Sequence, residues 1–457
     1  MKKNFSVNCY SHIGQPPFSK FIVPTISVIF VFSLTSLIEA AGREIKLNLT
    51  DEEYTHYSVA AARYGEWIKQ GLNALKENCV NNVEYILPFT ETGYTKEGDS
   101  AYCYDEWIIM TLGLQMALEG EGIRDDYKLI GPSQSLYKYM NKLSLLEYTY
   151  QKINDTKYAD LIDINSSHAY TKPNTGAGYE DTIYDPNASY SMAEESFIYY
   201  NEILNGVGQS DKEFWCDEFF ANAGDIKYWQ GVDMQAVQVA AGFVSGANNG
   251  INRLSLWQMF DCLWDSPATH GTAYNNNSTE FIGGVHAVGT CPSFVFADGF
   301  NCTNGKSCDC YRYYPYSSYL PRATYYGINL IGKYMNSENA SVYETSVAND
   351  TSEKDGGLFV TAIKNDDGKT VILVVNTENE AANVNIQFEK KSDATYTRYT
   401  YESGNVFPTE DATSIPSDKE INVYGKNSFD DVIPARSFSI YVANTEGFVG
   451  DDSEIPF

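Results

Sequence analysis

The chain has 457 residues, enough for two or three domains with a large hydrophobic core. It carries 60 acidic against 32 basic residues, a formal net charge of −28. Phosphate backbones repel such a chain, which argues against nucleic acid as a partner and leaves neutral or cationic ligands.

The first feature along the chain is an uncharged apolar run at residues 21–38, preceded by three lysines. It is typical of a secretory signal with small residues at Ala40 and Ala41, or of an uncleaved signal anchor. A mis-assembled N-terminus is the third interpretation. We assign residues 1–41 to this leader and expect a secreted protein, attached to a membrane only if the run is an anchor.

Potential glycosylation sites and cysteines agree with an oxidising compartment. Eight of the nine cysteines follow the apolar run, an even number suited to disulfide bonds. Nine N-x-S/T sequons also follow it. They begin at Asn48, Asn154, Asn165, Asn187, Asn276, Asn277, Asn301, Asn339 and Asn349. We expect Asn165 to be unmodified, because it lies in a predicted buried strand.

Four cysteines crowd one loop rich in Gly and Asn, namely Cys291, Cys302, Cys308 and Cys310. This pattern indicates local disulfide bonds. Zinc is the alternative, since His286 lies a few residues upstream, but the spacings match no familiar zinc pattern. We therefore expect no metal and no cofactor.

From residue 42 to 338, short apolar runs alternate with helical patterns, which predicts parallel strands with helices outside. The predicted strands are 43–49 (REIKLNL), 83–89 (VEYILPF), 127–133 (YKLIGPS), 159–170 (ADLIDINSSHAY), 213–220 (EFWCDEFF) and 251–261 (INRLSLWQMFD). The predicted helices are 58–77, 105–118, 136–151, 193–204, 233–244 and 325–335.

Residues 339–446 show no helical pattern and predict a β-sandwich domain, followed by an acidic tail at 447–457. The clearest signal is a hairpin, in which two apolar strands flank Asp367-Gly368. No flexible linker separates this domain from the helix that ends near Met335. We therefore expect the domain to pack against the α/β domain as a structural part and not as a free sugar-binding module.

Polar side chains stand where the predicted strands end, the place at which chemistry collects in an α/β barrel. They are Glu91, His168, Tyr170, Glu218, Trp257 and Gln258. Two carboxyls, an imidazole, a phenol and a flat ring are what cleavage of a glycosidic bond requires. One carboxyl protonates the leaving oxygen, the other attacks the anomeric carbon, and the aromatic ring supports the sugar.

The order and spacing of these motifs resemble the retaining glycoside hydrolases of clan A, such as families 39, 30 and 5, which are (β/α)8 barrels. The segment PFTETG stands where the family has NEP at strand 4, and YKLIGPS resembles the GGP strand 5 of family 39. IDINSSHAY is similar to strand 6, WCDEFF to strand 7 and SLWQMFD to strand 8. The resemblance spans about residues 50–445.

The resemblance implies Glu91 as the acid/base and Glu218 as the nucleophile, with their carboxyl groups about 5–5.5 Å apart. It further implies substrate-binding roles for Thr90, His168, Tyr170, Trp257 and Gln258. Tyr170 would also donate a hydrogen bond to the nucleophile. Thr90 replaces the Asn that usually precedes the acid/base, which leaves the usual contact to the sugar 2-hydroxyl in doubt.

The strand count departs from the family. Six strand–helix units are found where a barrel needs eight, so we expect a (β/α)8 TIM-barrel type that is incomplete at its N-terminus. An open barrel would expose its sheet edges and be unstable. The missing strands therefore favour the interpretation that the gene model is truncated.

Each candidate also has a structural alternative. The structural alternatives are a salt-bridged strand-end acid for Glu218 and a plain loop acid for Glu91, and we favour the catalytic role for both. Asp217 alternates to the other face of its strand, where we expect it to anchor the strand by hydrogen bonds. Cys216 and Cys262 are either a disulfide pair or buried thiols.

The sequence therefore predicts a secreted retaining glycoside hydrolase that cleaves β-glycosidic bonds in oligo- or polysaccharides by double displacement. The alternative is a non-catalytic carbohydrate-binding or structural glycoprotein of the cell surface, built on a degenerate barrel.

Overall fold

The computed structural model describes thirteen stretches of the chain, to which every structural statement below refers. They are residues 25–90, 100–134, 144–170, 186–220, 234–256, 262–264, 280–282, 286–288, 319–321, 323–337, 339–347, 357–403 and 415–444. The chain divides into two compact units, one of residues 1–82 and 108–125, the other of residues 83–107 and 126–457. Within the described stretches, no helix combines the length and the apolar character that crossing a membrane requires.

The first unit is helical and corrects one predicted strand. Residues 43–49 form the end of helix α1 (Thr25–Ile45) and the turn into α2 (Asp51–Glu77), not a strand. Thr50 begins α2 with a capping box, in which its side chain accepts from the Glu53 amide and Glu53 reaches back to the Thr50 amide. The alternation of Ile45 and Leu47 resembles a strand, yet both side chains are buried because the chain turns between two packed helices.

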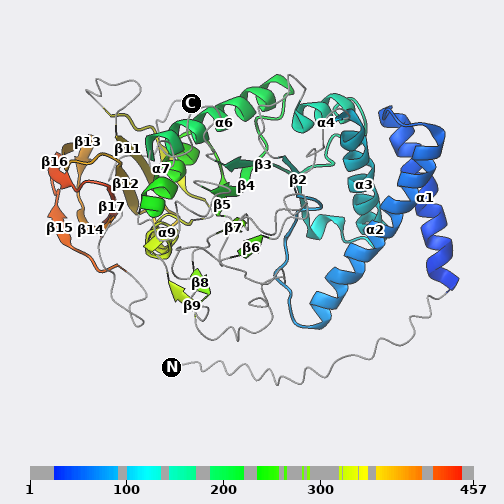
Figure 1. Cartoon of the computed structure of the whole chain (residues 1–457), viewed down its shortest axis with the longest axis horizontal. Helices are drawn as coiled ribbons and strands as arrows, with labels where there is room; N and C mark the ends of the chain where they lie inside the picture. Colours follow the sequence, from blue (N-terminus) through cyan, green and yellow to red (C-terminus); the bar gives the residue numbers. More distant parts are fainter. Residues whose placement is uncertain are drawn as a thin grey trace, which may run out of the picture. The chain divides into compact units, whose positions relative to one another are not determined.

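The second unit begins with a parallel sheet, which confirms the other five predicted strands (Figure 1). In sheet order they are β1 (Tyr85–Ile86), β2 (Lys128–Gln134), β3 (Ile164–Tyr170), β4 (Phe214–Phe220) and β5 (Arg253–Leu256). The helices between and after them are α3 (Ser100–Gly120), α4 (Leu145–Ile153), α6 (Pro186–Gly206), α7 (Met234–Asn248) and α9 (Ala323–Tyr334). Each overlaps a predicted helix.

The sheet is curled into a half-barrel. In a flat sheet, β1 and β4 would lie about 14 Å apart, three strand spacings. Instead the rings of Tyr85 in β1 and Trp215 in β4 are 4.8 Å apart between centroids. The Arg253 guanidinium of β5 lies 4.5 Å from the Trp215 ring and 4.9 Å from the Tyr85 ring. It also donates to the Tyr85 hydroxyl at 3.3 Å, so these side chains join β1 to β4 and β5 across the interior.

The C-terminal residues form antiparallel sheets, as the fold class predicted. One sheet has the strand order β10-β11-β12-β17-β14-β15, and β13 pairs with β16 in a second. Their bounds are β10 (Ser341–Tyr343), β11 (Leu358–Lys364), β12 (Thr370–Asn376), β13 (Ala382–Ser392), β14 (Thr395–Glu402), β15 (Lys419–Asn422), β16 (Lys426–Ile433) and β17 (Ser437–Ala443). The predicted hairpin joins β11 and β12, and Gly368 supplies its positive φ of 78°.

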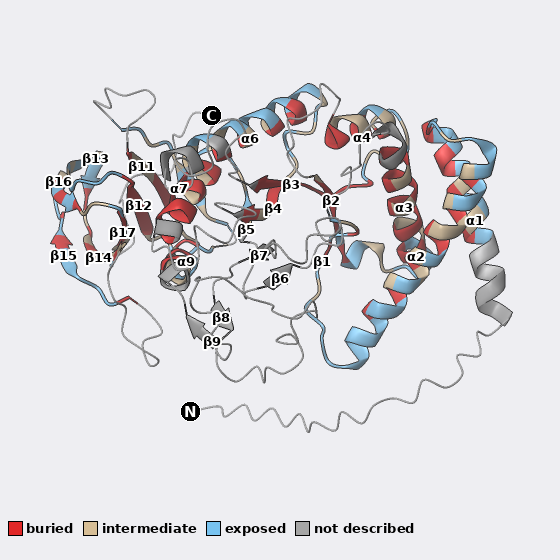
Figure 2. Cartoon of the chain, viewed as in Figure 1, coloured by how far each residue is buried: buried red, intermediate tan, exposed pale blue. Residues whose placement is uncertain are grey.

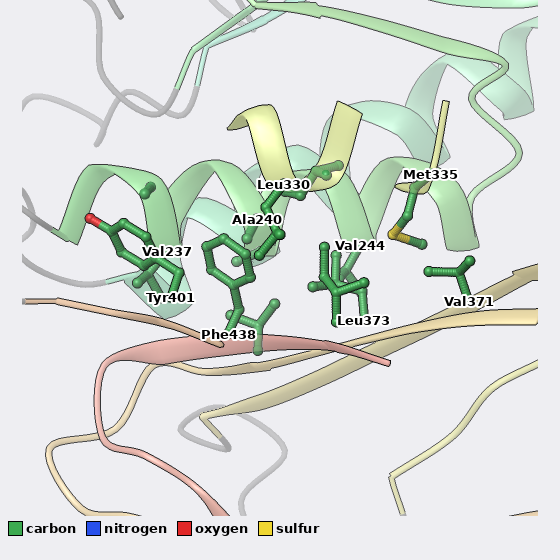
Figure 3. Packing of buried hydrophobic residues seen from close by; sticks show 14 of the residues in the cluster. Val237, Ala240, Val244, Leu330, Met335, Val371, Leu373, Tyr401 and Phe438 are labelled. Atoms are coloured by element: carbon green, nitrogen blue, oxygen red, sulfur yellow. The ribbon is translucent and has the colours of Figure 1, made fainter. Parts of the chain in front are cut away.

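The larger antiparallel sheet packs on helices α7 and α9, which confirms the expected packing of the C-terminal strands on the α/β part (Figure 3). Val237 and Ala240 of α7 and Leu330 of α9 share one buried cluster with Leu373 of β12 and Phe438 of β17. Buried residues line both sides of this contact in Figure 2. Most of these side chains expose less than a tenth of their surface, so the burial stabilises both parts together.

Helix α7 also supports the end of β4 from the outside. The Phe219 ring lies directly against Gly242, so closely that a Cβ at position 242 would clash with it. Phe219 shares a second buried cluster with Val239 of α7 and with Phe197 of α6. The strand that carries Asp217 and Glu218 is therefore held in place by packing on its outer face.

The remaining described strands are short antiparallel pairs. They are β6 (Cys262–Trp264) with β7 (Glu280–Ile282), and β8 (His286–Val288) with β9 (Tyr319–Pro321). Cys216 is a free, buried thiol, so a disulfide with Cys262 is not formed and the predicted alternative of a buried thiol holds for Cys216. The four cysteines at 291–310 lie outside the described residues.

Candidate active site

Four neighbouring elements bring polar side chains to one end of the half-barrel. Thr90 follows β1, Ser133 lies near the end of β2, His168 lies in β3, and Glu218 lies in β4. Because the strands are parallel, all four side chains belong to the carboxyl-terminal edge of the sheet. The sequence predicted this edge as the site, and three of these residues as part of it.

Glu218 has a polar neighbour at each oxygen of its carboxyl group. The Thr90 hydroxyl donates to Oε1 at 2.9 Å, and Nδ1 of His168 lies 3.4 Å from Oε2. The Glu218 side chain is 15% exposed, so the carboxyl remains open to solvent although its orientation is fixed. An oriented, accessible carboxylate at this position is what a nucleophile for a sugar carbon requires.

His168 connects Glu218 to β2. Its ring is completely buried, and Nε2 lies 3.0 Å from the Ser133 hydroxyl. That hydroxyl also lies 3.5 Å from the Thr90 hydroxyl. The four side chains therefore form a closed ring of polar contacts that leads from Glu218 through Thr90, Ser133 and His168 back to Glu218.

A β-bulge in β4 corrects the prediction for Asp217. Between β3 and β4, Ser167 pairs with Cys216 while His168 pairs with Glu218, so Asp217 is the extra residue of the bulge. Strict alternation would put Asp217 and Glu218 on opposite faces, but the bulge breaks it. The Ser133 hydroxyl and the His168 ring both lower the pKa of the Asp217 carboxyl. The carboxyl therefore lies near these two side chains and not on the outer face of the strand.

Asp217 also lacks the expected anchoring hydrogen bonds. Both of its carboxylate oxygens are buried and lack a well-formed hydrogen bond, although the Ser133 hydroxyl approaches closely enough to lower the pKa of the carboxyl. Burial raises the pKa of the Asp217 carboxyl above its ordinary value, and the nearby Ser133 hydroxyl and His168 ring offset this only in part. A second carboxyl group beside Glu218 is thus destabilised in its charged form.

We expect Asp217→Asn to make the protein more stable at neutral pH. The pKa of Asp217 is higher in the folded state than in the unfolded state. Its protonated form is therefore tolerated by the fold below the unfolded-state pKa of about 3.9, and this contribution to stability is lost as the pH rises through the folded-state pKa and the carboxyl becomes charged. Removing the unpaired charge should therefore raise the free energy of unfolding by about 1–3 kcal/mol at pH 7. Urea unfolding of both proteins at pH 4 and pH 7 measures this. An equal difference at the two pH values would contradict the prediction.

Other predicted site residues are only partly covered. Glu91, Trp257 and Gln258 lie outside the described residues. Tyr170 is described as the last residue of β3, but its side chain is not.

Sequence reasoning missed Ser133, although the signal was present. Ser133 ends the predicted strand YKLIGPS, just as the predicted site residues stand at the ends of theirs. A serine after Gly-Pro reads as a turn residue, which hides its role. Within the described stretches, no group of His, Cys, Asp or Glu side chains is arranged to hold a metal ion.

Comparisons with known proteins agree with the fold. Residues 345–403 match the glycosyl hydrolase family 30 beta sandwich domain, whereas the chain matches no curated protein. The family 51 arabinofuranosidase from Xanthomonas axonopodis pv. citri superposes with a TM-score of 0.51 at 14% identity, over 87% of this chain and 74% of its own. The fold, a curled parallel sheet followed by antiparallel β-sheets, is thereby confirmed, and residues 345–403 are similar to a glycoside hydrolase β-sandwich domain.

Two further solved structures are similar at lower scores. The family 30 subfamily 8 xylanase Xyn30A from Clostridium acetobutylicum has a TM-score of 0.47 at 14% identity, over 84% of this chain and 72% of its own. The family 44 xyloglucanase from Paenibacillus polymyxa has a TM-score of 0.47 at 10% identity, over 79% of this chain and 66% of its own. The chain thus spans about two thirds to three quarters of the length of these three proteins.

Proposed function

We propose that this protein is a retaining glycoside hydrolase that cleaves β-glycosidic bonds of oligo- or polysaccharides by double displacement. The observation that supports it best is the state of Glu218. Its carboxyl stands at the carboxyl-terminal edge of a parallel half-barrel, oriented by Thr90 on one oxygen and faced by His168 on the other. The match of residues 345–403 to a glycoside hydrolase domain supports the same class of reaction.

In the proposed mechanism, Glu218 attacks the anomeric carbon while Glu91 protonates the leaving oxygen. A glycosyl ester of Glu218 forms, and Glu91 then deprotonates the water that hydrolyses it, so the anomeric configuration is retained. Glu91 directly follows Thr90, whose hydroxyl is 2.9 Å from Glu218. This adjacency in sequence supports the proposal of Glu91 as the acid/base.

In addition to the two carboxyls, we propose five residues for sugar recognition. The proposed substrate contacts come from Thr90, His168, Tyr170, Trp257 and Gln258. Thr90 already donates its hydroxyl proton to Glu218, so only its oxygen remains to accept from a sugar hydroxyl. This differs from the Asn usually found there, which has two donor hydrogens and an acceptor oxygen.

We propose a secreted protein, with glycans at a subset of the sequons. Asn165 is completely buried and accepts from the Tyr150 hydroxyl at 2.6 Å, which is incompatible with a glycan. The Asn154 amide nitrogen, the atom that would carry a glycan, donates to the Val207 carbonyl. Asn48 and Asn339 are exposed and are the described sequons best suited to modification.

The test begins with a panel of chromogenic β-xylosides, glucosides, galactosides and mannosides. For any substrate that is cleaved, proton NMR of the first product shows whether the β anomer is released, as retention demands. A 2-deoxy-2-fluoro glycoside with a good leaving group should then trap the glycosyl ester. Mass spectrometry should find the adduct on the peptide that contains Glu218. Release of the α anomer first, or an adduct on another residue, would overturn the proposal.

The second candidate is a non-catalytic carbohydrate-binding glycoprotein. It is favoured by the described parallel sheet, which has five strands where a closed barrel has eight. Binding of oligosaccharides with no turnover on any substrate of the panel would support this candidate over the first.

A further inference from the structure

The Ser133 hydroxyl is the part of the polar ring that the proposed reaction leaves without a role. Ser133 is completely buried, and its backbone has a φ of 54°, a conformation that residues other than glycine seldom adopt. Its amide donates to the Ser166 hydroxyl at 3.0 Å, which helps to hold this conformation. The fold thus maintains an unfavourable backbone conformation at the point where the hydroxyl meets His168.

The distances around His168 restrict where its proton can lie. The Ser133 oxygen is closer to Nε2 of His168, at 3.0 Å, than to the Thr90 oxygen, at 3.5 Å. A serine hydroxyl has one hydrogen to donate. The Thr90 oxygen and the Asp217 carboxyl are the competing acceptors, and the 3.0 Å contact favours donation to Nε2. A neutral imidazole that accepts at Nε2 carries its proton on Nδ1.

The other side of the ring gives the same answer. Nδ1 lies 3.4 Å from Oε2 of Glu218, within the range of an ion pair but outside hydrogen-bond geometry, so the interaction is electrostatic. With the proton on Nδ1, an N–H dipole points toward the carboxylate and stabilises it. With the proton on Nε2, a lone pair would face the carboxylate oxygen, and the two would repel each other.

We infer that Ser133 is a positioning residue, whose hydroxyl fixes His168 in the tautomer that directs Nδ1–H at Glu218. The inference rests on the proposed function for its effect on catalysis, but not for the tautomer itself. Glu218 then receives N–H and O–H dipoles from opposite sides, from His168 and Thr90. Asp217 is the other titratable group near Ser133 and His168, and its carboxyl competes with Nε2 of His168 for the Ser133 hydrogen.

The test removes the hydroxyl without disturbing the backbone. Ser133→Gly is the better variant, because glycine adopts a φ of 54° without strain, and Ser133→Ala is the second. The matched control is Ser167→Ala, a buried serine of β3 one residue before His168. All variants are made in the full chain, and cooperative thermal unfolding shows which of them are folded.

The decisive measurement is the nitrogen-15 NMR spectrum of the imidazole rings, with the signal of His168 identified by its loss in His168→Gln. We expect the Nδ1–H tautomer in the wild type and in Ser167→Ala, and a mixture of tautomers or an imidazolium in Ser133→Gly. A wild-type Nε2–H tautomer or imidazolium at pH 7 would overturn the inference. So would a His168 spectrum that is unchanged in a folded Ser133→Gly.

Kinetics separates this inference from the proposed function. On a cleaved substrate, Ser133→Gly should lower kcat about tenfold, as expected for one lost hydrogen bond to the site, with KM changed less than about threefold. Unchanged kcat together with the altered tautomer would show that His168 does not act through Glu218. If the protein has no glycosidase activity, the NMR measurement still tests the role assigned to Ser133.

Discussion

Replacing Glu218 with Gln is expected to lower kcat/KM for a β-glycoside by about 10⁴-fold or more, because the amide cannot attack an anomeric carbon. The change keeps the size and shape of the side chain. The Thr90 hydroxyl, which donates to Oε1 at 2.9 Å, can donate to the amide oxygen in the same way. The fold should therefore persist, and the loss of activity would report chemistry and not unfolding.

A smaller variant gives a second readout for the same carboxyl. Glu218→Ala leaves space beside Thr90 and His168, into which azide can enter and attack the anomeric carbon directly. Azide should then restore turnover and yield a glycosyl azide of inverted configuration. Failure of azide to restore any turnover, together with more than a tenth of wild-type activity in Glu218→Gln, would assign the nucleophile elsewhere.

Glu213→Gln is the matched control for Glu218. Glu213 immediately precedes β4, at the opposite end of the strand, where it accepts from the Trp215 indole at 2.9 Å and pairs with Lys128 at 3.6 Å. It carries the same charge in the same chain segment but lies away from the polar ring. Its substitution should leave kcat/KM within about twofold of the wild-type value.

The sequence predicted the strands well where apolar runs end in polar residues. Five of the six predicted strands are present. A strand buried on both faces tends to be a near-continuous apolar run, although β3 (INSSHAY) carries this pattern only in the residues that lead into it. The exception at residues 43–49 shows the limit of such patterns. A short apolar alternation also fits a helix end and a turn, and the capping box of Thr50 and Glu53 marks that boundary more reliably.

The site was predictable in its position but not in its local geometry. Parallel strands determine that Glu218 and His168 share one edge, so their proximity follows from the strand pattern alone. The bulge at Asp217 depends on how β3 and β4 pair, and strict alternation predicts the wrong face. The role of Ser133 depends on a backbone with φ of 54°, which no periodicity reveals.

Stability of the C-terminal sheets should depend most on one buried carboxylate, Asp431 in β16. Its side chain is 3% exposed and accepts from Lys419 at 2.6 Å and from Arg398 at 3.0 Å. The Tyr441 hydroxyl donates to it at 3.0 Å, and the Val432 amide at 2.8 Å. We expect Asp431→Ala to lower the free energy of unfolding by about 3 kcal/mol, because Arg398 loses one of its two carboxylate partners and Tyr441 keeps a buried hydroxyl without an acceptor.

Asp430→Ala provides the control, since Asp430 is the adjacent residue but is exposed, and its carboxyl accepts a hydrogen bond from the Asn385 side chain at 2.7 Å. Its substitution should change the free energy of unfolding by less than about 0.5 kcal/mol.

The pH dependence gives an independent check on the charge of Asp431. Burial raises the pKa of Asp431, but the bonds from Lys419 and Val432 and the charge of Arg398 outweigh it, so the folded-state pKa is lowered. A lowered pKa means that the contribution is present above the unfolded-state value of about 3.9 and is lost as the pH falls through the folded-state value. The difference between wild type and Asp431→Ala in denaturant unfolding should therefore be constant from pH 5 to 7 and shrink below about pH 4.

Because β17 packs on α7, and α7 supports the end of β4, the same variant should also inactivate at a lower temperature. A difference that persists unchanged at the lowest pH, or a loss no larger than that of Asp430→Ala, would show that the Asp431 network does not stabilise the sheet through its charge.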